Sequence, residues 1–211
     1  ALLNRVKPAA PSPDTLARAA DWSKINAGRL HAVEQSVVEN DQLIDLLRQN
    51  ARQVQFNQYN LEVFLSIANL CRQNLRMLQG IARIDALLTS AHDDAQSGHP
   101  RHAVAALDKA TQEAQDMLGE RNRVLKETTA VWYKSWLPRV ARANGRTFLP
   151  ELDDVKDHLP DRTVGMEYLV YRELHLPLGE WADKIHTARN VYAKAHKLPA
   201  SEGALPWDQV E

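Results

Sequence analysis

Apolar residues recur at helical spacing over much of the first hundred residues, and no proline lies between Pro13 and Pro100. A proline inside a helix removes a backbone hydrogen bond and clashes with the preceding turn, which costs about 3 kcal/mol. A long proline-free stretch with this spacing therefore predicts packed helices. One continuous helix over 13–97 would be more than about 120 Å long, too long for one domain of this size. We therefore expect a turn in the polar stretch Gln53–Asn60.

Before this turn, one apolar seam follows alternating spacings of three and four residues. Its members are Leu30, Val33, Val37, Asn40, Ile44, Leu47, Ala51 and Val54. Such a seam is typical of a helix in a bundle. Asn40 is its polar exception, and a buried asparagine at such a position is expected to fix the register between helices.

After the turn, two adjacent apolar stripes lie on one helix. The first consists of Leu61, Phe64, Ala68, Cys71, Leu75, Leu78 and Ala82, and the second of Val63, Ile67, Leu70, Met77, Ile81, Ile84 and Leu88. Two stripes form a wide face, so this helix is expected to bury it against two neighbours. The only cysteine, Cys71, excludes an intrachain disulfide and is expected to be a small buried residue of its stripe.

The start of the chain is expected to be a tail or linker over 1–11, because small residues and prolines alternate there. Ser12 and Pro13 then form a suitable helix start, since a serine hydroxyl caps free amides and proline fits the first helical position. We expect a first helical piece that carries Leu16, with a bend or break at 26–28.

Glycine and proline mark the boundaries of the third long helix. Gly98 ends the helix before it, since glycine suits the left-handed residue that follows a helix. Pro100 opens the third helix, and Pro138 is expected to bend or end it. The dipeptide Asn144-Gly145 is a further stop signal, and 146–165 is expected to be an ordered, irregular loop.

The last helical region is expected from about Met166 to His196, with an interruption at Pro177 and a C-terminal tail over 199–211. The apolar–polar alternation of strands is nearly absent. The sequence therefore predicts an all-α fold: an up-and-down bundle of about four main helices over 12–198, with an irregular loop before the last helix.

Composition narrows the possible partners without naming one. Lys and Arg number 26 against 27 Asp and Glu, so no basic footprint indicates nucleic acid or an anionic membrane. No apolar run approaches the roughly 20 residues that cross a bilayer. The sequence also lacks a nucleophile elbow, a glycine-rich phosphate loop and a zinc-protease signature. We therefore expect no cofactor, no nucleic acid and no membrane partner.

Aromatic residues concentrate in the last third of the chain, where seven of the ten Trp and Tyr residues lie between 132 and 192. Trp132 and Trp136 are four residues apart and so share a helix face. Flat rings on one face can stack on sugars. The favoured interpretation is that these rings anchor the following loop against the bundle, because amphipathic aromatics satisfy loop carbonyls through their N–H groups.

Basic and acidic residues form two separate groups in the sequence next to these aromatics. The cations are Lys134, Arg139, Arg142 and Arg146, and the acids that follow are Glu151, Asp153, Asp154, Asp157 and Asp161. The favoured interpretation is an acidic loop that folds back onto the arginines. The alternative is a carboxylate cluster for a metal or for acid–base chemistry. A calcium loop is not supported, because its glycine and distal glutamate are missing, and adjacent Asp153 and Asp154 point in different directions.

Histidines form one loose cluster, at His92, His99 and His102. They lie at a polar helix junction without an evident set of carboxylate or cysteine ligands. Zinc sites have more specific patterns than this, so no metal site is predicted.

Three segments resemble a known family. They are WYKSWLPRV at 132–140, ANGR at 143–146 and DDVKDHLPDRT at 153–163, together with Arg172, Leu176-Pro177, Trp181 and Arg189-Asn190. These segments resemble the helical C-terminal region of some bacterial glycoside hydrolases of family 20, the β-N-acetylhexosaminidases. The resemblance is sharpest over 132–199 and weak before it.

The resemblance implies a non-catalytic helical accessory domain that supports the catalytic barrel or a subunit interface. The family's chemistry lies in a TIM barrel with an adjacent Asp-Glu pair, which Asp153-Asp154 does not match, so no catalytic residue is carried over. The candidate ligand or interface residues are Trp132, Trp136, Arg139, Asp153, Asp154, Asp157, His158, Arg162 and Trp181. The implied partners are the catalytic domain of the same enzyme or another subunit, with a glycan as a further candidate, and the implied location is periplasmic or secreted.

A second hypothesis is a stand-alone helical module for protein interaction or oligomerisation. The wide apolar face of 61–88 motivates it, since an apolar groove on a bundle binds partner proteins. Catalysis within the loop 150–165 is the least favoured interpretation.

Overall fold

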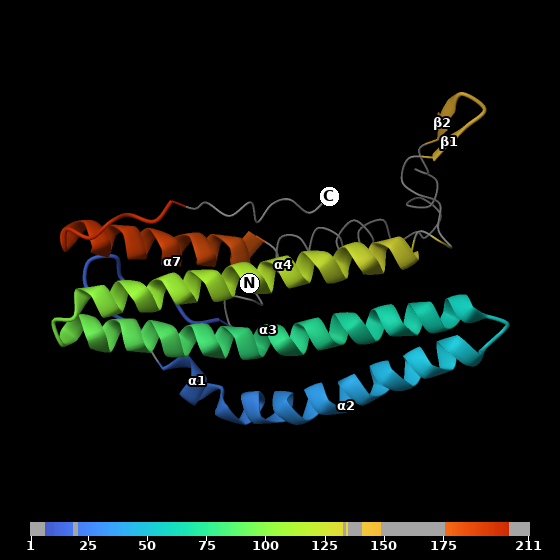
Figure 1. The fold of residues 1–211 in the computed structure, drawn as a ribbon, viewed down its shortest axis with the longest axis horizontal. Helices are drawn as coiled ribbons and strands as arrows, with labels where there is room; N and C mark the ends of the chain where they lie inside the picture. Colours follow the sequence, from blue (N-terminus) through green and yellow to red (C-terminus); the bar gives the residue numbers. More distant parts are fainter. Residues whose placement is uncertain (1–6, 19–20, 133, 135–140, 149–175, 203–211) are drawn as a thin grey trace, which may run out of the picture.

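The structure is a computed structural model that describes residues 7–18, 21–132, 134, 141–148 and 176–202. Four long helices pack side by side in it (Figure 1): α2 (Ala27–Gln53), α3 (Gln58–Gln96), α4 (Pro100–Trp132) and α7 (Leu176–Ala195). Successive helices run in opposite directions along the long axis. The fold is therefore an all-α, up-and-down bundle, as the sequence predicts.

The connection between α2 and α3 confirms the expected turn. Helix α2 ends at Gln53 and α3 begins at Gln58, after Asn57 in the left-handed conformation with φ 56°. Asn40 of the apolar seam donates its Nδ2–H to the carbonyl oxygen of Ala68 at 2.9 Å. This bond joins a side chain of α2 to the backbone of α3 and fixes the relative height of the two helices.

The connection between α3 and α4 also follows the sequence signals. Gly98 adopts φ +75°, which an L side chain rarely tolerates, and Pro100 is the first residue of α4. The amide of His99 donates to the carbonyl of Asp94 at 2.8 Å, which closes the end of α3.

Helix α7 packs on the first half of α4 and leaves the second half beyond it (Figure 1). The residues at helical spacing on its inner face are all buried: Leu178, Trp181, Ile185, Ala188 and Tyr192. Pro177 lies in the first turn of α7, where its missing amide costs nothing. The expected helical residues 166–175, and with them the expected interruption of a longer helix at Pro177, lie outside the described residues.

The described residues before α2, 7–18 and 21–26, form what we call the N-terminal segment. This segment does not contain the helix that was expected to start at Ser12 and Pro13 and to carry Leu16. Among the described residues before α2, Trp22–Ile25 alone is helical, as the short helix α1, and residues 13–15 form a turn instead of a helix. Leu16 has φ 54°, and hydrogen bonds between the backbones of Ser12 and Leu16 and of Ser12 and Ala17 close the turn. The side chain of Leu16 is fully buried in the core, and this burial outweighs the helix start signal of Ser12 and Pro13.

The expected tails are partly packed against the bundle. Pro8 and Pro11 are buried, and the ammonium of Lys7 lies 5.8 Å from the centre of the Trp181 ring. At the other end, Asn190 of α7 pairs with the backbone of Ser201, accepting from its amide at 2.9 Å and donating to its carbonyl at 3.1 Å. Residues 7–11 and 199–202 therefore contact the bundle, and 203–211 lie outside the described residues.

A short hairpin corrects the interpretation of Asn144-Gly145 as a helix stop. Strand β1 (Ala141–Ala143) pairs antiparallel with β2 (Arg146–Phe148). Asn144 and Gly145 have φ 51° and 74°, the pair of left-handed residues that a two-residue hairpin turn requires. Residues 146–148 are thus a strand, although 146–165 was expected as an irregular loop.

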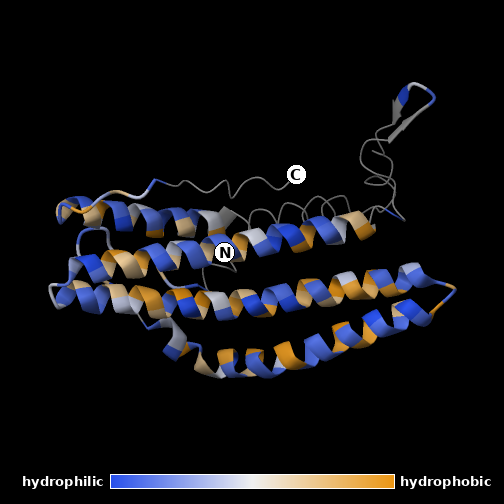
Figure 2. Ribbon diagram, in the orientation of Figure 1, coloured by the Kyte–Doolittle hydropathy of each residue, from blue (hydrophilic) through white to orange (hydrophobic). Residues whose placement is uncertain are grey.

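The hydrophobic core occupies one end of the bundle, where the second half of α3, the first half of α4 and α7 meet. Leu88, Leu107 and Ile185 are fully buried there, one from each helix. Hydrophobic residues nevertheless continue along α2 and α3 into the half of the bundle beyond α7 (Figure 2). In that half, Cys71 is exposed, so its expected burial is wrong.

Candidate functional site

The structure places few of the predicted site residues. Seven of the nine lie outside the described residues: Trp136, Arg139, Asp153, Asp154, Asp157, His158 and Arg162. The expected fold-back of the acidic loop onto the arginines lies outside them as well. Trp132 is the last residue of α4.

Trp181 is a core residue of α7. Its side chain is only 1% exposed, and it belongs to the same hydrophobic cluster as Leu88 and Leu107. A ring buried to this degree serves packing, so its position does not support a contact with a sugar or other ligand.

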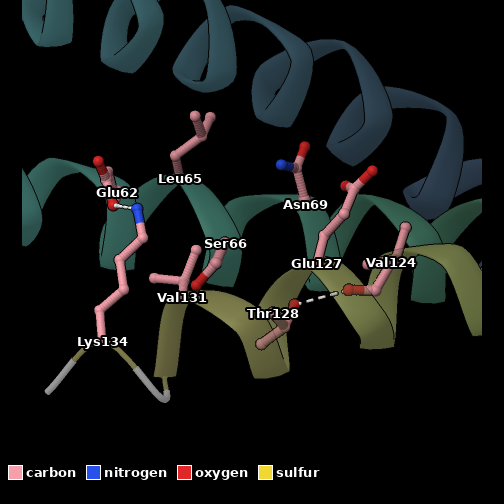
Figure 3. A pocket seen from close by; sticks show the side chains of 9 residues that line it. All are labelled: Glu62, Leu65, Ser66, Asn69, Val124, Glu127, Thr128, Val131 and Lys134. Atoms are coloured by element: carbon pink, nitrogen blue, oxygen red, sulfur yellow. Dashed lines mark hydrogen bonds and ion pairs between the residues drawn. The ribbon is translucent and has the colours of Figure 1, made fainter. Parts of the chain in front are cut away.

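A small pocket of about 220 Å³ lies between α3 and α4 in the half of the bundle beyond α7 (Figure 3). Leu65 of α3 and Val124 and Val131 of α4 supply its apolar wall. At one end, the ammonium of Lys134 pairs with the carboxylate of Glu62, which joins the residues after α4 to the start of α3.

The polar groups of this pocket are already engaged with neighbours inside the protein. The Ser66 hydroxyl donates to the carbonyl of Val63, and the Thr128 hydroxyl donates to the carbonyl of Val124, each at 2.8 Å. Glu127 pairs with Arg123 one turn before it on α4. A nucleophile needs a hydrogen bond to a base, and the hydroxyls of this pocket donate to backbone carbonyls instead. The hydroxyls of this pocket are therefore not arranged as nucleophiles.

A more informative feature is one face of α3, which other residues cover near Asp85 and which is open to solvent near Ile67. Asp85 and Ile67 are eighteen residues apart, which is five helical turns, so they lie on the same face. Asp85 is 1% exposed because the N-terminal segment covers it, with hydrogen bonds from Arg18 and from the amide and hydroxyl of Ser23. Ile67 is 49% exposed. The N-terminal segment thus covers the face at Asp85, whereas the face remains open to solvent at Ile67.

The exposed part of this face continues onto α2. Asp41 of α2 pairs with Arg72 and Arg76 of α3 along one flank of the helix pair. Helical spacing places Leu43 and Leu46 on the opposite flank of α2 from Asp41. The same geometry places Phe64 and Ile67 on the matching flank of α3. We call these four residues the apolar flank; all are more than 40% exposed, with Phe64 at 57%.

The sequence predicted that this face is apolar but not that it is open. The two stripes of α3 were expected to be buried along their whole length, which is correct for Ile81, Ile84 and Leu88 and wrong for Phe64 and Ile67. The exposure of Phe64 and Ile67 could have been inferred from the lengths of the segments. The N-terminal segment that covers Asp85 is too short to cover all 39 residues of α3.

The histidine cluster is also more complete than the sequence indicated. Asp94, from the last turns of α3, lies beside His99 and His102, so a carboxylate does accompany them. His92, expected as a third histidine, is not part of this group.

No family model, curated protein or solved structure matches the chain. Among the described helices, none combines the length and the apolar character that crossing a bilayer requires.

Proposed function

We propose that this chain is a non-catalytic helical accessory domain of a β-N-acetylhexosaminidase-like glycoside hydrolase. In this role its apolar flank contacts the catalytic barrel or another subunit of the enzyme. The enzyme class comes from the resemblance over 132–199, and the docking role comes from the apolar flank.

The apolar flank is the observation that carries the docking role. Four large apolar side chains on one flank of the α2–α3 pair are exposed, in a bundle that buries the continuation of the same face. Exposed apolar patches on soluble bundles mark contact surfaces, because leaving them in water costs about 25 cal/mol per Å². Salt bridges from Asp41 to Arg72 and Arg76 line the other flank, which is suited to solvent.

The side chains of the α3–α4 pocket give no argument for catalysis at that pocket. The hydroxyls in the α3–α4 pocket donate to backbone carbonyls, and its carboxylates form ion pairs with Lys134 and Arg123. The pocket offers a ligand an apolar wall between two helices and no general acid or base beside a nucleophile.

The docking role is tested by reconstitution. The reading frame and operon that encode this chain identify the adjacent catalytic domain or subunit, which is produced separately and mixed with the chain. Sedimentation velocity should show a complex that is lost when Phe64 and Ile67 are both changed to Ser. Val191→Ser on α7 is the matched control, because Val191 is also 40% exposed but lies away from the flank.

Two outcomes would count against the accessory role. If the chain self-associates and Phe64→Ser with Ile67→Ser abolishes this, the flank is an oligomerisation surface and the stand-alone module is correct. If no glycoside hydrolase domain is encoded with the chain and the double variant sediments like the wild type, both roles of the flank are wrong.

A direct glycan contact is a separate part of the proposal and rests on Trp132 and Trp136. Titration with chitin oligosaccharides should quench or shift tryptophan fluorescence, and Trp132→Phe with Trp136→Phe should remove the response. The buried Trp181 provides the control, because Trp181→Phe should leave the sugar response unchanged. An unaltered spectrum at millimolar sugar would remove glycan binding from the role.

A further inference from the structure

Three metal-ligating side chains meet at the turn between α3 and α4. One ligand atom from each of Asp94, His99 and His102 lies within 4.8 Å of the other two. The Nδ1 atom of His102 is 4.0 Å from the carboxylate of Asp94, and the two imidazole rings have their centres 5.6 Å apart. The atoms are thus near one another without a direct hydrogen bond between Asp94 and His102.

The backbone holds these three residues in place. The amide of His99 donates to the carbonyl of Asp94 at 2.8 Å, across the turn that Gly98 makes with φ +75°. The amides of His102 and Ala103 both donate to the carbonyl of His99 at 3.1 Å, which starts α4. Each ligand is therefore attached to hydrogen-bonded backbone, and only side-chain rotation separates the three from a common centre.

We propose that Asp94, His99 and His102 form a zinc site that joins the end of α3 to the start of α4. Ligands of a tetrahedral Zn²⁺ lie about 2.0–2.2 Å from the ion and hence about 3.4 Å from one another. Separations of up to 4.8 Å must shorten by up to roughly 1.4 Å. Both histidines are exposed and can rotate by this amount without disturbing the core.

The ligand set selects the metal. Two imidazoles and one carboxylate suit zinc and its borderline neighbours, whereas Ca²⁺ and Mg²⁺ prefer oxygen ligands alone. Three protein ligands leave a fourth position for water, as in zinc sites that exchange ligands. Asp94 and His102 also line a shallow cavity of about 250 Å³, so the ion would remain in contact with solvent.

Binding is tested by isothermal titration of ZnCl₂ into the full chain, without a histidine tag and after removal of metals by a chelator. Cys71 is exposed and its thiolate also binds zinc, so all proteins carry Cys71→Ser. We expect one site per chain with micromolar affinity. His99→Ala, His102→Ala and Asp94→Asn should each weaken it by at least about tenfold.

His31 provides the matched control, because it is an exposed histidine that pairs with one carboxylate, Glu34, at 3.7 Å. His31→Ala should leave the zinc affinity unchanged. Cobalt in place of zinc should give the visible absorption of tetrahedral coordination, and His102→Ala should abolish it. Zinc should also raise the melting temperature of the parent protein but not that of His102→Ala.

The proposal is wrong if the Cys71→Ser parent binds no zinc, or if its binding survives in His99→Ala and His102→Ala. It is also wrong if His31→Ala weakens binding as much as His102→Ala, since zinc would then bind exposed histidines without a specific site. All the altered side chains are at least partly exposed, so circular dichroism should confirm that each variant folds.

Discussion

Arg189 of α7 holds both carboxylate oxygens of Asp108 on α4. Its Nε–H donates to Oδ1 at 2.7 Å and one Nη donates to Oδ2 at 3.0 Å, while the other Nη donates to the carbonyl of Pro199 at 2.6 Å. One buried guanidinium thus joins α4, α7 and the segment that follows α7. Arginine suits this position because its planar group presents paired donors to a carboxylate.

Removal of this contact should destabilise the bundle. We expect Arg189→Ala to lower the free energy of unfolding by about 3 kcal/mol, because it leaves acceptors unpaired beside a buried position. Arg189→Lys should recover only part of the lost stability, since lysine keeps the positive charge but lacks the paired, planar donors of the guanidinium. Urea unfolding measures the change, and Arg123→Ala on the exposed face of α4 should cost less than about 0.5 kcal/mol. If Arg189→Ala and Arg123→Ala lowered the free energy of unfolding equally, Arg189 would not have the stabilising role proposed for it.

Asp85 of α3 should be the residue that holds the N-terminal segment against the bundle. Its buried carboxylate accepts hydrogen bonds from Arg18, from the Ser23 amide at 2.9 Å and from the Ser23 hydroxyl at 2.7 Å. Asp85→Ala should cost about 3–5 kcal/mol, because breaking a buried pair leaves its partners unsatisfied. Limited proteolysis should then cut the segment before α2 in the variant and not in Asp93→Ala, whose side chain is exposed.

Trp181 should be required for packing α7 onto the bundle. Because its ring is 1% exposed, Trp181→Ala should cost about 3–5 kcal/mol through lost burial and a cavity. Val191→Ala, on the exposed side of the same helix, should stay within about 0.5 kcal/mol in thermal or urea unfolding. A small effect of Trp181→Ala would mean that α7 contributes little to the core.

Glu120 should make a small, pH-dependent contribution to stability. Two hydrogen bonds from Arg123, at 2.7 and 2.8 Å, lower the pKa of the Glu120 carboxyl. A lowered folded-state pKa stabilises the protein above the unfolded value, about pH 4.3, and this stabilisation is lost as the pH falls through the folded value. Glu120→Gln should therefore cost roughly 0.3–0.5 kcal/mol at pH 7, and the cost should vanish in strong acid. Urea unfolding of the wild type and of Glu120→Gln, at pH 7 and in strong acid, measures whether this cost disappears as the pH falls.

Local patterns predicted most of the helical frame. Gly98 and Pro100 mark a boundary because glycine permits a left-handed residue and proline lacks an amide, and both effects act within a few residues. The apolar spacing of α7 identifies its buried face for the same reason. The hairpin was missed because three-residue strands are too short to show alternation, and Asn-Gly serves a helix end and a hairpin turn equally well.

The features that were missed depend on distant residues. Asp85 looks like a solvated charge in a helix, and its partner Arg18 is 67 residues away in the chain. Leu16 turns away from a helix because a core formed by other elements buries it. The exposure of Ile67 likewise depends on where other segments end, which periodicity alone does not contain. The approach of Asp94 to the two histidines is local and depends on the geometry of the turn at Gly98, which helical periodicity does not describe.

The change in covering along α3 has a consequence for its dynamics. Amide hydrogens exchange with solvent through local openings, whose free energy depends on how much neighbouring structure must separate. Leu88 is enclosed by the core, whereas Ile67 is half open to water, so one continuous helix of 39 residues should exchange its amides at two very different rates. The segment around Ile67 would then fray while the far end stays closed. A docked partner would be detected first as slowed deuterium uptake there.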